Sequence, residues 1–185
     1  MDDDINVASY LPGASMAGSA LRDVKTSIFD QYSRQNVPKV LITIMTGKPN
    51  DEIERSINVL KMACVLMFAL GLTSRYSPQS LNQASGEPHS EYVLISETFP
   101  EAALVAQKMA DKIKKVVSIV KSRSERCVQA EDTRMDIAFI VSNCRHIPET
   151  IFFNSWTLRE IHFTRYQLIL KTCAPQLSLS LMAPK

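Results

Sequence analysis

The sequence predicts an α/β fold built on a doubly wound, mostly parallel sheet, and three observations predict it. Short apolar runs rich in β-branched residues alternate with longer segments in which apolar residues recur every three or four positions. The short runs are apolar on both faces, which is typical of strands buried in a parallel sheet. The connections between segments are short, and this alternation favours helices on both sides of the sheet.

The first part of the chain predicts a helix, a strand and the start of a second helix. A helix over 17–32 carries its apolar residues on one face, at Leu21, Val24, Ile28 and Tyr32. A strand over 40–45 follows a proline break and is almost entirely apolar. Asn50 can cap the next helix, and Asp51 and Glu52 suit the positive end of its dipole.

The middle of the chain predicts two further strands. The second helix has an apolar face at Ile53, Ile57, Leu60 and Cys64. A strand over 64–70, closed by Gly71, comes next, so helix and strand meet at Cys64. One helical turn is expected around 79–84 and a short strand over 91–96.

A long helix is expected over 100–121, because Pro100 suits a first turn and apolar residues recur at helical spacing. Its lysines are interpreted as a solvated face: Lys108, Lys112, Lys114 and Lys115. A polar linker over 121–134 precedes a strand over 136–141. Residues 150–171 could form a helix, although their aromatic and β-branched content leaves this open.

Composition excludes several classes of partner. The net charge of +2, from 21 basic and 19 acidic residues, gives no electrostatic reason to expect nucleic acid or a membrane surface. The longest apolar run, Met62 to Leu72, is far shorter than the ~20 residues that cross a bilayer. The N-terminus is acidic and does not resemble a secretory signal, which predicts an intracellular protein if this is the full product.

The four cysteines are dispersed and form no CxxC pair, so the sequence does not support a zinc framework: Cys64, Cys127, Cys144 and Cys173. We interpret them as buried or free thiols, because a free cysteine behaves as a small buried apolar residue. A disulfide such as Cys64–Cys127 is expected only if the protein is secreted.

Three stretches together resemble the von Willebrand factor A domain in the form repeated along type VI collagen chains. Tyr10–Leu21 is similar to its glycine-rich metal loop and the helix that follows. Asn36–Lys48 is similar to the strand and loop that normally end in Thr-Asp-Gly. Leu81–Gly86, with Glu91–Val93, is similar to the last short helix and edge strand. The likeness covers residues ~8–120 and corresponds to the second half of such a domain.

After the linker, Met135–Glu149 resembles the first strand and metal loop of a following A domain. The resemblance therefore implies a truncated or split collagen VI-like chain with partial tandem domains. We expect the C-terminal part of one domain over 1–120, a linker over 121–134, the start of a second domain over 135–171, and a tail over 172–185.

The resemblance implies a magnesium site at three loops, but this chain departs from the family's ligands. Ser15 stands where the family has Thr and keeps a hydroxyl, whereas Thr46 replaces an Asp. Ser142, Cys144 and His146 stand where Asp, Ser and Ser are expected. Hard cations need carboxylates for charge balance, so we expect a degenerate metal site and no cofactor. Cys144 and His146 are too few ligands for zinc.

Half of an A domain would leave the apolar strand 40–45 with an open edge, which is an aggregation hazard. Residues 136–141 have the character of the family's missing first strand. We therefore predict that this segment folds back beside 40–45, as in a circular permutation, with 150–171 covering one face. The resulting sheet would have about four strands.

The sequence contains no catalytic motif, since its three histidines lie near no recognisable nucleophile: His89, His146 and His162. The resemblance implies a non-enzymatic, extracellular interaction module of matrix or cell-adhesion type, with protein partners such as collagens. One alternative is a non-functional remnant of a collagen VI-like chain. Another is a small α/β enzyme with an unrecognised site.

Overall fold

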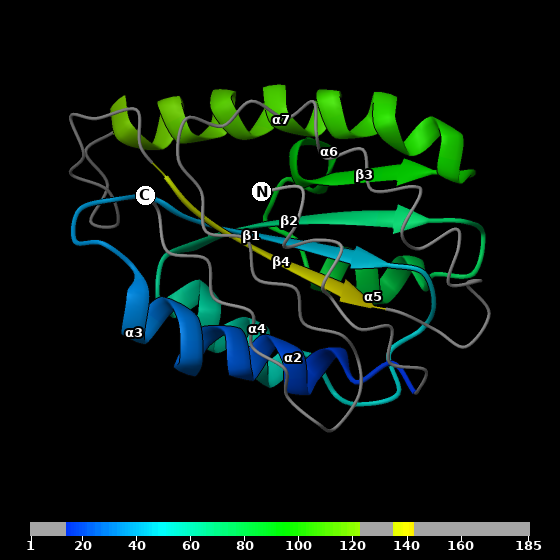
Figure 1. The fold of residues 1–185 in the computed structure, drawn as a ribbon, viewed down its shortest axis with the longest axis horizontal. Helices are drawn as coiled ribbons and strands as arrows, with labels where there is room; N and C mark the ends of the chain where they lie inside the picture. Colours follow the sequence, from blue (N-terminus) through cyan, green and yellow to red (C-terminus); the bar gives the residue numbers. More distant parts are fainter. Residues whose placement is uncertain (1–13, 123–134, 143–185) are drawn as a thin grey trace, which may run out of the picture.

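The computed structural model describes residues 14–122 and 135–142. They form a four-stranded sheet in which every described strand pair is parallel, with helices on both faces (Figure 1). The strand order is β3-β2-β1-β4, with β1 at Lys39–Met45, β2 at Val65–Leu72, β3 at Val93–Ser96 and β4 at Asp136–Ser142. The predicted doubly wound α/β fold is confirmed.

The helices divide between the two faces of the sheet (Figure 1). One face is covered by α4 (Glu54–Met62) and by a continuous helical segment made of α2 (Ala17–Val24), η1 (Lys25–Phe29) and α3 (Asp30–Tyr32). The long helix α7 (Phe99–Ser122) covers the other face. Two short helices connect β2 to β3: α5 (Pro78–Gln83) and α6 (His89–Tyr92). No helix in these ranges is long and apolar enough to cross a membrane.

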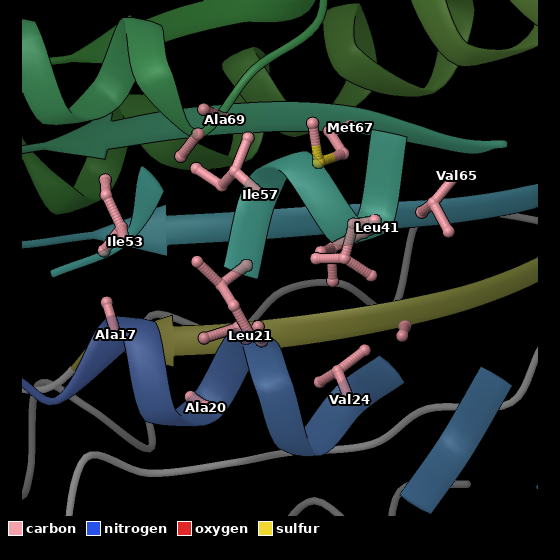
Figure 2. Packing of buried hydrophobic residues seen from close by; sticks show 14 of the residues in the cluster. Ala17, Ala20, Leu21, Val24, Leu41, Ile53, Ile57, Val65, Met67 and Ala69 are labelled. Atoms are coloured by element: carbon pink, nitrogen blue, oxygen red, sulfur yellow. The ribbon is translucent and has the colours of Figure 1, made fainter. Parts of the chain in front are cut away.

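Alternate residues of each strand supply two separate cores. On the α2 and α4 face, Leu41 and Met45 of β1 are completely buried together with Leu21 of α2. Figure 2 shows Leu21, Val24 and Ile57 pointing into the layer between these helices and the sheet. On the opposite face, Ile42 of β1 and Phe139 of β4 pack with the α7 side chains Met109, Ile113, Val116 and Val117. The central strands are therefore buried on both sides, which accounts for their continuous apolar runs.

The helix predicted over 17–32 is present, but its apolar stripe is not the predicted one. Val24 and Ile28 are buried as expected, whereas Tyr32 is 43% exposed and Phe29 is buried instead. The cause is the π-helical turn η1, which inserts an extra residue and rotates all later positions around the helix axis. The simple three-four spacing was therefore wrong beyond Ile28.

Several predicted element boundaries shift. Cys64 adopts a left-handed conformation (φ 60°), which ends α4 and starts β2 at Val65. Gly71 does not close β2 but lies within it, where a Cβ would come 2.9 Å from the Tyr76 ring. Residues 91–92, predicted as strand, form the end of α6. The turn predicted at 79–84 is confirmed as α5, which Ser77 caps through its side chain.

The lysines of α7 lie at the solvated surface, as predicted, and two of them also contact the α6 region. Lys112 Nζ donates to the Ser90 carbonyl oxygen at 2.6 Å. Lys115 Nζ lies 3.4 Å from Glu91 Oε2. Because α7 packs on β3, these contacts help to fix the outer strand of the sheet against the long helix.

The strand β4 lies beside β1, as predicted from the open edge that half of an A domain would leave. Lys39 is opposite Asp136 and Met45 is opposite Ser142, in a continuous parallel register. This pairing confirms that residues 136–141 fold back beside 40–45. The proposed cover from residues 150–171 lies outside the described residues, and the division of the chain into partial domains stays a prediction.

An ion pair fixes the start of β4. Arg34 Nε and Nη2 donate to Asp136 Oδ1 at 2.8 and 2.6 Å, and the Arg34 backbone N–H donates to Asp136 Oδ2 at 2.8 Å. Arg34 Nη2 also reaches the Met135 carbonyl oxygen. The Asp136 side chain is only 9% exposed, so these charge-assisted hydrogen bonds are largely shielded from water. They join the residues before β1 to β4 across 102 positions of sequence.

Replacing Asp136 with alanine is expected to lower the free energy of unfolding by about 2 kcal/mol, because several charge-assisted hydrogen bonds are lost together. The matched control is Asp30→Ala, which removes the Lys25–Asp30 pair. Asp30 is 45% exposed, so the control should cost less than about 0.5 kcal/mol. Urea denaturation measures both, and equal losses would contradict a special role for Asp136.

Candidate site at the carboxyl edge of the sheet

Three of the residues predicted at the metal loops map to one edge of the sheet. Thr46 follows the last residue of β1, and Ser142, at the end of β4, is opposite Met45 in the register. Ser15 precedes α2, whose N-terminus lies at this same end (Figure 1). Ser15 and Thr46 are buried, at 1% and 3% exposure. Cys144 and His146, the other predicted positions, lie outside the described residues.

Asn50 joins the loop after β1 to the loop before α2, which is not the role that was predicted for it. The Asn50 N–H donates to the Ser15 carbonyl oxygen at 2.7 Å, and Asn50 Oδ1 accepts from the Ser15 N–H at 3.2 Å. Asn50 was predicted to cap the helix that follows it. That prediction is wrong, because α4 begins later, with Ile53 as its N-cap and no side-chain cap.

Asp51 caps the N-terminus of α2 from a distance of more than thirty positions in sequence. Its Oδ1 accepts from the Gly18 N–H at 2.9 Å and its Oδ2 from the Ser19 N–H at 2.7 Å. The residue at the N-cap of α2, Met16, offers no side-chain hydrogen bond. A carboxylate is favoured there because the first helical N–H groups lack partners and carry partial positive charge. Asp51 was predicted to serve the dipole of α4 instead.

Gly18 allows this arrangement, because the start of α2 crosses the backbone before α4 at very short range. A Cβ at Gly18 would lie 2.0 Å from the Glu52 carbonyl oxygen. The Gly18 carbonyl oxygen accepts from Ser56 Oγ at 2.9 Å, so α4 also binds the glycine from its other side. Gly18 is therefore a buried point of contact between two elements.

The oxygen-bearing side chains named at this edge are either neutral or already hydrogen-bonded. Ser15 and Thr46 contribute neutral hydroxyls, and both oxygens of the Asp51 carboxylate accept backbone hydrogen bonds. Residues 14–122 and 135–142 contain no group of three or more His, Cys, Asp or Glu side chains that could hold a metal. Magnesium loses strongly bound water on binding and needs carboxylate charge in exchange.

One cysteine prediction is corrected by the structure. Cys64, interpreted from sequence as a buried or free thiol, is disulfide-bonded. It is half-buried and stands between α4 and β2. The other three cysteines lie outside the described residues: Cys127, Cys144 and Cys173.

Comparison with known proteins gives the family of this fold. The family model of the von Willebrand factor type A domain matches residues 1–111. Among similar proteins, the collagen alpha-4(VI) chain of Mus musculus is 25% identical over 146 residues, which is 75% of this chain and 6% of that protein. Matrilin-3 of Gallus gallus is 26% identical over 119 residues, 62% of this chain and 25% of matrilin-3.

Cuticlin-6 of Caenorhabditis elegans is 33% identical over 79 residues, which is 43% of this chain and 14% of that protein. The chain thus spans a quarter or less of the length of each of these relatives. The family match covers more than half of this chain and includes β1, β2, β3 and their helices. The chain therefore belongs to the von Willebrand factor type A domain family.

Proposed function

We propose that this chain is a non-enzymatic protein-interaction module of the extracellular-matrix and cell-adhesion type, and that it binds its partner without a metal ion. Family membership supports the first part, together with the similarity to a type VI collagen chain and to a matrilin. Matrix proteins such as collagens are the proposed partners. The disulfide at Cys64 supports an oxidising compartment, where such bonds persist.

The observation that carries metal independence is the engagement of Asp51. Its carboxylate is the acidic group tied to the loops that hold Ser15 and Thr46, and it caps α2 with both oxygens. Moving this carboxylate away from α2 to reach a cation would leave the Gly18 and Ser19 N–H groups without their acceptor. An unsatisfied, partly buried donor costs about 1–3 kcal/mol, which opposes metal binding.

Magnesium is therefore expected not to stabilise the protein. A ligand present at a hundred times its Kd stabilises the native state by ~2.7 kcal/mol, which raises the Tm of a domain of this size by several degrees. We expect the Tm of the full chain in millimolar magnesium to stay within about 1 °C of the value in EDTA. A rise of several degrees would contradict metal independence, and its loss in Asp51→Asn would place the ion at this edge.

The interaction role itself is tested by binding of the full chain to an immobilised panel of matrix collagens, measured by surface plasmon resonance. We expect saturable binding to at least one of them, with the same affinity in EDTA and in magnesium. Binding that requires magnesium would agree with the interaction role but would contradict its metal independence. A folded chain that binds none of the panel would contradict the proposed collagen partners.

A further inference from the structure

The outer edge of β3 has the properties of a contact between two copies of this chain. We infer that two copies pair through this edge, antiparallel across a two-fold axis at Ile95, so that their sheets join into one. This inference is independent of the proposed function, which concerns a different protein as partner. It rests on the outward backbone groups of β3, on the exposed side chain of Ile95 and on the charges along α7.

The strand β3 is an edge of the sheet, since β2 is its only neighbour among the described strands (Figure 1). The Ser96 carbonyl oxygen points toward β2, because the Thr73 N–H donates to it at 2.9 Å. The backbone groups of successive strand residues point in alternate directions, so the N–H and carbonyl groups of Ile95 point away from β2. This edge therefore offers a donor and an acceptor to a further strand.

The edge of β3 lacks the residues that usually block an exposed strand. Proteins protect such edges with lysine, with proline or with a bulge. Residues 93–96 contain no charged residue and no proline, and the Ile95 side chain is 51% exposed although it is apolar. The strand has only four residues, so it can support only a small interface. An unblocked apolar edge of this length favours a weak, reversible association.

The edge of β3 is complementary to itself when a second copy is turned by a two-fold axis perpendicular to the sheet. Such an axis reverses the strand direction and keeps each face of the sheet on its own side. With the axis at Ile95, this residue lies opposite the same residue of the second copy, and their outward N–H and carbonyl groups bond to each other. The two exposed side chains then lie on one face, about 5 Å apart at Cβ, and cover each other.

One flank of α7 lies on the β3 side of the molecule and carries charges of both signs. Glu101, Lys108 and Lys112 share this flank, because they are seven and four positions apart. Lys112 identifies the flank, since its Nζ donates at 2.6 Å to the carbonyl oxygen of Ser90, which lies in the short helix before β3. Glu101 and Lys108 are both exposed.

The positions of these two charges along α7 match the proposed axis. The helix α7 begins three positions after the end of β3 and runs back along it, which places its start near the level of Glu97. The two strand steps from Glu97 to Ile95 cover about 7 Å, as do about five helical residues, so Ile95 is level with residues 104–105. In two antiparallel helices centred there, Glu101 lies opposite Lys108 of the second copy, and the same contact repeats across the axis. This charge complementarity favours a second copy as the occupant of the edge.

Sedimentation velocity of the full chain tests the association. We expect a monomer at about 1 µM and a growing share of dimer up to about 200 µM, as is typical of a small interface. Ile95→Lys should abolish the dimer, because it places two positive charges opposite each other at the axis. Met62→Lys is the matched control, since Met62 is 77% exposed on α4, and it should dimerise like the wild-type chain. Circular dichroism checks that both variants are folded.

A wild-type chain that stays monomeric over this range would overturn the inference and would leave the edge to a strand of another protein. A folded Ile95→Lys variant that still dimerises would overturn it as well. So would species larger than a dimer, because a two-fold contact is closed and does not propagate.

Charge reversal on α7 tests the two-fold arrangement without changing β3. Glu101→Lys and Lys108→Glu should each raise the Kd of the dimer about threefold or more, because each places like charges opposite each other at both contacts. An equimolar mixture of the two variants should dimerise again, because both contacts of the mixed dimer then join opposite charges. A mixture that dimerises no better than either variant alone would contradict the proposed pairing.

Discussion

Replacing Phe139 with alanine is expected to lower the free energy of unfolding by about 3–5 kcal/mol. Phe139 is 3% exposed and packs in the core beneath α7, opposite Ile42 of β1. The substitution removes most of a large apolar side chain and leaves a cavity between a strand and a helix, which relax only partially. Such a loss is a large part of the about 5–15 kcal/mol that stabilises most domains, so the variant should melt at a much lower temperature or remain unfolded.

The matched control is Phe139→Leu, which keeps much of the apolar volume and should cost about 1 kcal/mol. Denaturation in urea, followed by circular dichroism, measures both variants. If Phe139→Ala costs less than about 1 kcal/mol, β4 does not contribute to the core in the way that its burial indicates. A loss in the control as large as that in the alanine variant would indicate a strained site rather than a simple cavity.

Replacing Gly18 with alanine is expected to cost about 3 kcal/mol, even though alanine is the better helix former by about 1 kcal/mol. The added Cβ would lie 2.0 Å from the Glu52 carbonyl oxygen, and that oxygen belongs to backbone that cannot rotate away. The loop must therefore move, which also weakens the two hydrogen bonds from Asp51 to the N-terminus of α2. The steric cost exceeds the gain in helix propensity.

Ser19→Ala is the control for this substitution, because it lies in the same turn and donates to Asp51 through its backbone N–H rather than its side chain. It should change the free energy of unfolding by less than about 0.5 kcal/mol. Thermal melts of both variants provide the comparison. A Gly18→Ala variant as stable as the wild-type chain would contradict the close crossing of α2 and the residues before α4.

Much of the fold could be predicted because strands that are buried on both faces have continuous apolar sequences. Residues 40–45 and 137–141 are almost entirely apolar, without alternation, and both segments are buried. The position of β4 beside β1 followed from asking how such a strand could avoid an open edge. The stripe of the first helix could not be predicted beyond Ile28, because no residue in that segment signals the π-turn that exposes Tyr32.

The candidate site was predicted less completely, because its main contacts are long-range. The resemblance assigned Ser15, Thr46 and Ser142 to metal loops, and the register and loops bring these backbone positions to one edge of the sheet. It did not indicate that Asp51 serves α2, since capping rules consider only the nearest helix. One signal was available: Met16, before the helix, cannot cap it, so an acceptor had to come from elsewhere.

The central structural claim is that β4 completes the sheet beside β1 in parallel register. Backbone nuclear Overhauser effects in the isotopically labelled full chain test this most directly. We expect contacts that pair Lys39 with Asp136, Ile42 with Phe139 and Met45 with Ser142. Contacts from residues 39–45 to β2 alone, with none to residues 136–142, would contradict the claim, as would a register shifted by one residue.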